Sequence, residues 1–201
     1  MERELVLSGI GGQGIQLCAQ VLARAVLDEG RQVQLFGNYG GMMRGGNTEA
    51  TLIVADDRIE GPPTVSSTWS ALLMHHDYSE PALARMRPGS VVFVNTTVFD
   101  APVDWSPYVL IEVPATKLAA ESEGIQTALM VMLGAYVAVT EMAGMEAVAA
   151  AVEAALPRYR AQHAARNVAA MQVGAASVAA MAGAYRAWAP APARASVGAA
   201  G

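Results

Sequence analysis

The sequence predicts an α/β protein, a three-layer domain with a mostly parallel sheet of about six strands and an alanine-rich helical C-terminal third. Two observations lead to this class. Short runs rich in valine, leucine and isoleucine recur through the first half of the chain, and beyond Lys117 they give way to helical patterns rich in alanine and methionine. The 201 residues are 53% hydrophobic and 15% charged, the composition of a chain that forms one sizeable core.

Six runs are expected as strands because they are rich in β-formers and bounded by Gly, Pro, Asn or Asp. Several are continuously apolar, which suits strands covered on both faces. The six runs are Glu4–Ser8, Gln32–Phe36, Glu49–Ala55, Ala71–His75, Ser90–Asn95 and Tyr108–Val113.

A helix is expected between the first two strands, where Ile15, Cys18, Leu22 and Val26 recur on one face. It should end near Gly30, which can supply a C-terminal cap. Strand, helix and strand form a βαβ unit, and its right-handed crossover predicts that the two strands pair in parallel.

The later helices are read from caps and from composition. Ser79 is a candidate N-cap, with Pro81 in the first turn. Three further helices are expected at Thr127–Ala143, Met145–Leu156 and Ala165–Trp188. Residues 1–188 are therefore expected to form one domain, and residues 189–201, which have no apolar period, a disordered tail.

Composition argues against several classes of function. The net charge is −5, Lys117 is the single lysine and no basic stripe is present, so nucleic-acid binding is not expected. One cysteine, Cys18, cannot support a disulfide, a cysteine zinc site or iron–sulfur ligation within the chain. The N-terminus carries no signal-peptide pattern, and the apolar stretch Ala128–Val139 is too short to span a bilayer. We expect a cytoplasmic protein without a membrane partner.

The stretch SGIGGQG, residues 8–14, satisfies G-x-G-x-x-G through Gly9, Gly11 and Gly14. A dinucleotide site also needs an acidic residue about 20 positions on, and the second strand ends LFGN without one. A nucleotide P-loop needs a lysine where Ile15 stands. Two alternatives stay open: backbone N–H groups that receive another anionic ligand at a helix N-terminus, or glycines that serve close packing alone.

A second glycine-rich stretch, GNYGGMMRGGN, covers residues 37–47 and surrounds Tyr39 and Arg44. Loops that follow parallel strands meet at one edge of a sheet, so this stretch should lie beside the first glycine loop. Arginine suits bidentate contact with phosphate or carboxylate, and tyrosine suits stacking or packing against a partner.

These stretches together carry a family resemblance. GIGGQGI, YGGMMRGGNTEATLIV, MRPGSVVFVN and ALMVMLGAY, in this order over roughly residues 4 to 185, resemble the gamma subunit of 2-oxoacid:ferredoxin oxidoreductases. The resemblance implies a complex that oxidatively decarboxylates a 2-oxoacid to an acyl-CoA. It also implies partners: alpha and beta subunits that hold thiamine diphosphate, a ferredoxin-like delta subunit that holds [4Fe–4S] clusters, and ferredoxin or an NAD-reducing subunit as electron acceptor.

The resemblance implies that the gamma subunit helps to receive coenzyme A and caps the active site, so no catalytic residue is expected here; the residues themselves offer no plausible metal-ligand set. His75, His76 and His163 are interpreted as surface or satisfied histidines, and Cys18 as a core residue. The rival hypotheses are a stand-alone dinucleotide-binding dehydrogenase domain and a purely structural subunit. The candidate coenzyme A contacts are Gly9, Gly11, Gly12, Gln13, Gly14, Tyr39, Arg44, Gly45, Gly46 and Asn47.

Overall fold

The computed structural model describes residues 1–39, 45–61, 65–156 and 162–188, built around one six-stranded sheet in the order β2-β3-β1-β4-β5-β6. All six predicted strands are confirmed, most with longer ends than predicted. Their bounds are β1 Glu2–Ile10, β2 Gln32–Tyr39, β3 Asn47–Ala55, β4 Thr68–Leu73, β5 Met86–Asn95 and β6 Val109–Val113.

Strand directions confirm a mostly parallel sheet but correct one pairing. β1, β4, β5 and β6 are parallel neighbours, whereas β3 lies between β1 and β2 and is antiparallel to both. The prediction that β1 and β2 pair was therefore wrong, although they run in the same direction. Only residues 40–46 separate β2 from β3, and so short a connection joins antiparallel neighbours. β3 consequently takes the place beside β1.

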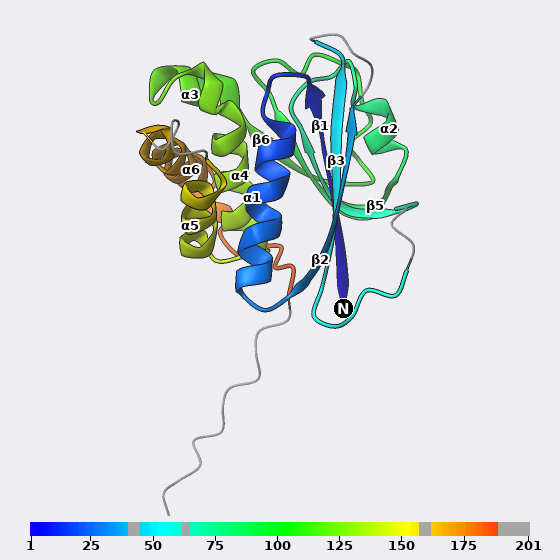
Figure 1. Cartoon of the computed structure of the whole chain (residues 1–201). Coiled ribbons are helices and arrows are strands. Elements are labelled where there is room, and N and C mark those ends of the chain that lie inside the picture. The colour runs from blue at the N-terminus through cyan, green and yellow to red at the C-terminus, as the bar shows by residue number, and fades with distance from the viewer. Residues whose placement is uncertain (40–44, 62–64, 157–161, 189–201) are drawn as a thin grey trace, which may run out of the picture.

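The helices divide unequally between the two faces of the sheet (Figure 1). One face carries α1, α3, α4, α5 and α6, and the other carries the short helix α2. The bounds are α1 Ile15–Asp28, α2 Glu80–Leu83, α3 Ala115–Glu121, α4 Ala128–Thr140, α5 Met145–Ala155 and α6 Ala164–Ser177. The predicted layers are thus present, one thick and one thin.

Alternation along the strands fills the two cores. In β1, Leu5 and Leu7 point into the larger core under the helices, and Val6 points into the smaller core under α2. In β5, Phe93 belongs to the larger core and Val92 to the smaller. Side chains of a strand alternate between faces, so continuous apolar runs are what a sheet covered on both sides requires.

Two of the helical predictions need correction. α3 was not predicted, and the helix expected over Ala165–Trp188 ends at Ser177. Beyond a short 3-10 turn at Ala179–Met181, the chain lies against the end of α4, where the amides of Gly183 and Tyr185 donate to the carbonyls of Ala138 and Val139 at 2.8 and 3.1 Å. These terminal carbonyls have no partner inside α4, and they hold the chain in a non-helical path.

α4 and α6 cross at very short range, which explains the small residues of the C-terminal third. A Cβ on Gly134 would lie 1.9 Å from the carbonyl oxygen of Met171, and a Cβ on Gly174 would lie 1.8 Å from that of Val131.

Among the described residues, no helix is long and apolar enough to cross a membrane. The tail predicted for residues 189–201 lies outside the described residues.

Candidate functional site

The first glycine loop connects the end of β1 to the start of α1. Gly14 stands at the N-cap with φ +86°, a left-handed conformation that glycine adopts without strain, and Gly12 has φ +103°. The first helical hydrogen bond runs from the Cys18 amide to the Gly14 carbonyl at 2.9 Å. Among the described residues, no side chain caps this end, and no acidic residue lies in the first turn, so the amides ahead of Cys18 and the positive end of the helix dipole suit an anion.

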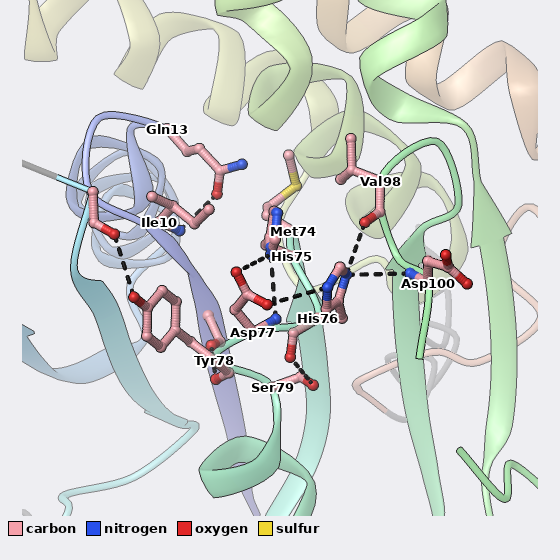
Figure 2. A network of polar contacts seen from close by, with 12 residues as sticks. Ile10, Gln13, Met74, His75, His76, Asp77, Tyr78, Ser79, Val98 and Asp100 are labelled. Atoms are coloured by element: carbon pink, nitrogen blue, oxygen red, sulfur yellow. Dashed lines mark hydrogen bonds and ion pairs between the residues drawn. The ribbon is translucent and has the colours of Figure 1, made fainter. Parts of the chain in front are cut away.

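Gln13 organises the loop from within. Its side-chain Oε1 accepts a hydrogen bond from the backbone amide of Ile10 at 2.8 Å, and its backbone amide donates to the Ile10 carbonyl at 3.1 Å. The side chain lies over Gly9, where a Cβ would come within 2.4 Å of that oxygen. Figure 2 shows the Gln13 amide nitrogen directed away from Ile10. The side-chain oxygen therefore holds the loop, and the side-chain nitrogen points away from this contact.

The second glycine loop touches the first, as predicted, in the part that the structure describes. The Gly11 amide donates to the Gly46 carbonyl at 2.8 Å, and Ile10 stands opposite Asn47 in the β1–β3 ladder. A Cβ on Gly11 would lie 3.4 Å from that carbonyl oxygen. The contact comes from the start of β3 rather than from a parallel strand, because β3 is the neighbour of β1.

Two further polar groups belong to the same edge. The Tyr78 hydroxyl donates to the Gly45 carbonyl at 3.3 Å and so ties the end of β4 to the second loop. The Asn47 Oδ1 atom is buried and has no hydrogen-bond partner in the part of the chain that the structure describes. Arg44, with Gly40 and Gly41, lies outside the described residues, and Tyr39 is placed only as the last residue of β2.

A pocket of about 290 Å³ opens beside the first glycine loop. It lies between that loop, the ends of β4 and β5, and the start of α4, so it occupies the carboxyl edge of the parallel strands, where α/β sheets bind ligands. Its walls are mostly apolar. They are formed by Gly12, Gln13, Met74, Val98, Thr116, Ile125, Gln126, Ala128 and Leu129.

The residue after Met74 begins a cluster that the sequence analysis did not assign to function. His75, His76 and Asp77 come shortly after β4. Asp77 Oδ2 lies 3.5 Å from His75 Nδ1, and Asp77 Oδ1 lies 3.1 Å from His76 Nε2 (Figure 2). The sequence signal that could have pointed to this cluster is its position after a strand that ends at this edge.

The expectation that Cys18 is a core residue agrees with the structure, because the residue is fully buried and burial raises the pKa of its thiol.

The strand order also bears on the dinucleotide hypothesis. In a dinucleotide-binding fold the ribose-binding acid ends the strand beside β1, but here β3 separates β2 from β1. The site is therefore not arranged as a dinucleotide-binding crevice, independently of which residue ends β2.

The family described as pyruvate ferredoxin/flavodoxin oxidoreductase matches residues 4–177. The 2-oxoglutarate synthase subunit KorC of Methanocaldococcus jannaschii is 28% identical over 79% of this chain and 86% of that subunit. The crystal structure of a keto/oxoacid ferredoxin oxidoreductase gamma subunit from Geobacter sulfurreducens is 26% identical, with a TM-score of 0.72 over 89% of this chain and 99% of that one. The 2-oxoglutarate:ferredoxin oxidoreductase from Magnetococcus marinus, solved with 2-oxoglutarate, coenzyme A and succinyl-CoA bound, shares the fold at 18% identity, with a TM-score of 0.82 over 94% of this chain and 33% of that one.

Proposed function

Because this chain belongs to the pyruvate ferredoxin/flavodoxin oxidoreductase family, as a gamma subunit of the 2-oxoacid:ferredoxin oxidoreductases, we propose that it receives coenzyme A at the edge where its two glycine loops meet. The observation that carries the proposal is the hydrogen bond from Gly11 to Gly46, which fixes the loops side by side at the start of α1. Membership of this family does not favour the rival hypothesis of a stand-alone dinucleotide-binding dehydrogenase domain.

The edge has the chemistry that coenzyme A requires. Its pyrophosphate carries negative charge, and the uncapped amides at the start of α1 supply donors and a positive dipole without any lysine. The buried Asn47 Oδ1 atom can accept a hydrogen bond from a ligand amide such as those of the pantetheine arm. Arg44, in the second loop, supplies a guanidinium for a phosphate.

The pocket beside Gly12 gives the ligand a direction. A Cβ on Gly12 would meet no described residue within 4 Å, so in the part of the chain that the structure describes the backbone there is open to close approach. The apolar walls formed by Met74, Val98 and Leu129 suit the hydrocarbon part of an extended arm that continues from the phosphates. Bound in this way, coenzyme A covers the edge, and the chain orders the substrate and excludes water from the partner's site.

The redox and decarboxylation chemistry is assigned to partner subunits. Thiamine diphosphate and [4Fe–4S] clusters supply that chemistry when bound in the alpha, beta and delta subunits. This chain does not fit a cluster, since its single cysteine, Cys18, is fully buried in the core. It is proposed as a non-catalytic subunit, with ferredoxin or an NAD-reducing subunit as the electron acceptor of the complex.

The proposal is tested by adding a negative charge to the edge of the intact complex. Asn47→Asp preserves the shape of the side chain but places a carboxylate at the edge that receives the anionic ligand, and at a separation of about 5 Å from a phosphate the repulsion is about 1–3 kcal/mol. The apparent KM for coenzyme A should rise about 5-fold to 150-fold while the KM for the 2-oxoacid stays unchanged.

Gln32→Glu is the matched control, because it adds the same charge at the opposite end of the sheet, where Gln32 is exposed at the start of β2. It should leave both constants unchanged. Equal effects of Asn47→Asp on both substrates, or no effect on either, would contradict coenzyme A binding at this edge.

A further inference from the structure

The turn after β4 brings together two imidazoles and a carboxylate outside the proposed coenzyme A contacts. His75, His76 and Asp77 each offer one ligand atom, and these atoms lie within 4.8 Å of one another. Asp77 Oδ2 is 3.5 Å from His75 Nδ1, and Asp77 Oδ1 is 3.1 Å from His76 Nε2. In Figure 2 the carboxylate faces both rings. We propose that these three residues bind a divalent transition-metal ion, with Zn²⁺ as the fitting species.

Two of the separations are close to those between neighbouring ligand atoms of a coordination shell. Zinc binds histidine nitrogen and carboxylate oxygen at about 2.0–2.2 Å, so neighbouring ligand atoms in a tetrahedral site are about 3.3–3.5 Å apart. The two nitrogen–oxygen separations, 3.1 and 3.5 Å, are close to this value but involve different oxygens of Asp77, and one ligand atom from each of the three residues lies within 4.8 Å of the other two. The two rings are stacked with centroids 4.6 Å apart and an interplanar angle of 30°.

The hydrogen bonds of His76 are compatible with a metal ligand. Its Nδ1 atom lies 3.1 Å from the Val98 carbonyl, which can only accept, and the tautomer that donates to this carbonyl has its lone pair on Nε2, the nitrogen that faces Asp77. Metal-bound histidines usually donate their other ring N–H in this way. The Asp100 amide lies 3.3 Å from the same Nδ1 and can bond only to the other tautomer. A cation at Nε2 selects the tautomer that donates to Val98.

The backbone of the turn is held by buried hydroxyls. Ser79 Oγ donates to the His76 carbonyl at 2.8 Å, and Ser8 Oγ donates to the Tyr78 carbonyl at 2.6 Å. The Asp77 amide donates to His75 Nδ1 at 3.2 Å. Coordination through that nitrogen would replace this long hydrogen bond, and because Asp77 is exposed its amide can bond to water instead. The backbone that carries the three ligands is thus held in place, and rotation of their side chains would complete the coordination shell.

The donor set limits the ion. Two imidazoles and one carboxylate suit Zn²⁺, Co²⁺, Ni²⁺ or Fe²⁺ rather than Mg²⁺ or Ca²⁺, which prefer oxygen ligands. Three protein ligands leave a fourth position, and the exposed side of Asp77 opens it to water or to an exogenous ligand. This site departs from the expectation that the chain holds no metal, which was based on each histidine taken alone.

The test is a titration of the untagged, chelator-treated full chain with Co²⁺, whose visible absorption reports histidine and carboxylate coordination, followed by displacement with Zn²⁺. We expect one equivalent to bind, with at least a 10-fold higher Kd in His76→Gln and in Asp77→Asn. His163→Gln is the matched control, since the chain has three histidines and His163 lies at the start of α6; its Kd should be unchanged.

Asp77→Asn keeps the test decisive if His76→Gln does not fold, because Asp77 is exposed and its replacement is nearly isosteric. The absence of saturable binding by the wild-type chain would overturn the proposal, as would equal binding by wild type and Asp77→Asn. No coenzyme A is present in these titrations, so their outcome is separate from that of the proposed function.

Discussion

Replacing Gln13 in two ways separates its structural role from a role in ligand binding. Gln13→Ala removes the Oε1 acceptor of the partly buried Ile10 amide and leaves an unfilled space over Gly9. An unsatisfied amide costs about 1–3 kcal/mol, and for a chain of this size each kcal/mol lowers Tm by about 2–4 °C. We therefore expect Tm to fall by about 2–12 °C. Gln13→Glu keeps an acceptor oxygen at the same place, so its Tm should stay within about 2 °C of wild type.

The second variant tests the ligand. Glutamate exchanges the amide nitrogen, which points away from Ile10, for a charged oxygen at the proposed pyrophosphate site (Figure 2). With the new carboxylate about 5 Å from a phosphate, the Coulomb repulsion is about 1–3 kcal/mol, which predicts a KM for coenzyme A that is about 5-fold to 150-fold higher. The assays are thermal unfolding of the chain and steady-state kinetics of the complex with a viologen dye. A Gln13→Ala chain with unchanged Tm would refute the structural role, and a Gln13→Glu complex with unchanged KM would refute the ligand contact.

Three further predictions concern the crossing helices, the buried thiol and the second loop. Gly134→Ala places a Cβ 1.9 Å from the Met171 carbonyl oxygen, so α4 and α6 must separate by about 1.5 Å to reach ordinary contact; the free energy of unfolding should fall by about 3 kcal/mol, and an unchanged denaturation midpoint would contradict the crossing. Burial raises the pKa of the Cys18 thiol, so only the unfolded chain ionises above about pH 8.5. The stability of wild type relative to Cys18→Ala should then fall by about 1.4 kcal/mol per pH unit above that value, and parallel profiles would be evidence against a buried thiol. Arg44→Ala should raise the KM for coenzyme A by about 10-fold, because it removes a charge-assisted contact that contributes about 1.4 kcal/mol or more. The KM for the 2-oxoacid should hardly change, and equal rises in the two KM values would argue against a phosphate contact.

The six strands and the first helix could be predicted from sequence because their signals are local. Apolar runs between turn residues mark strands, and the face formed by Ile15, Cys18 and Leu22 marks a helix. Strand order is not local: β3 displaced β2 from β1 because of a short connection whose consequence depends on the whole sheet.

The missed elements depend on tertiary contacts. α3 spans only Ala115–Glu121, starts at Pro114 without a side-chain cap, and is held by the buried Asn95, which accepts from the Thr116 amide at 3.2 Å and donates to its hydroxyl at 2.8 Å. The link between Gly11 and Gly46 was predicted in outline from the shared sheet edge, but the internal use of the Gln13 oxygen was not. His75 and His76 were interpreted as surface or satisfied histidines because sequence does not show how their rings are oriented, and Val98, which contacts the His76 ring, lies 22 residues away in sequence.

Hydrogen exchange of the gamma subunit within the intact complex, with and without coenzyme A, tests the central claim most directly. The claim predicts that coenzyme A slows exchange of the amides at residues 10–16 and 45–48, where the two glycine loops meet, and leaves the turn at residues 141–144, at the opposite end of α4, unchanged. Exchange at both glycine loops that is identical with and without saturating coenzyme A would contradict the assignment of this edge as its binding site.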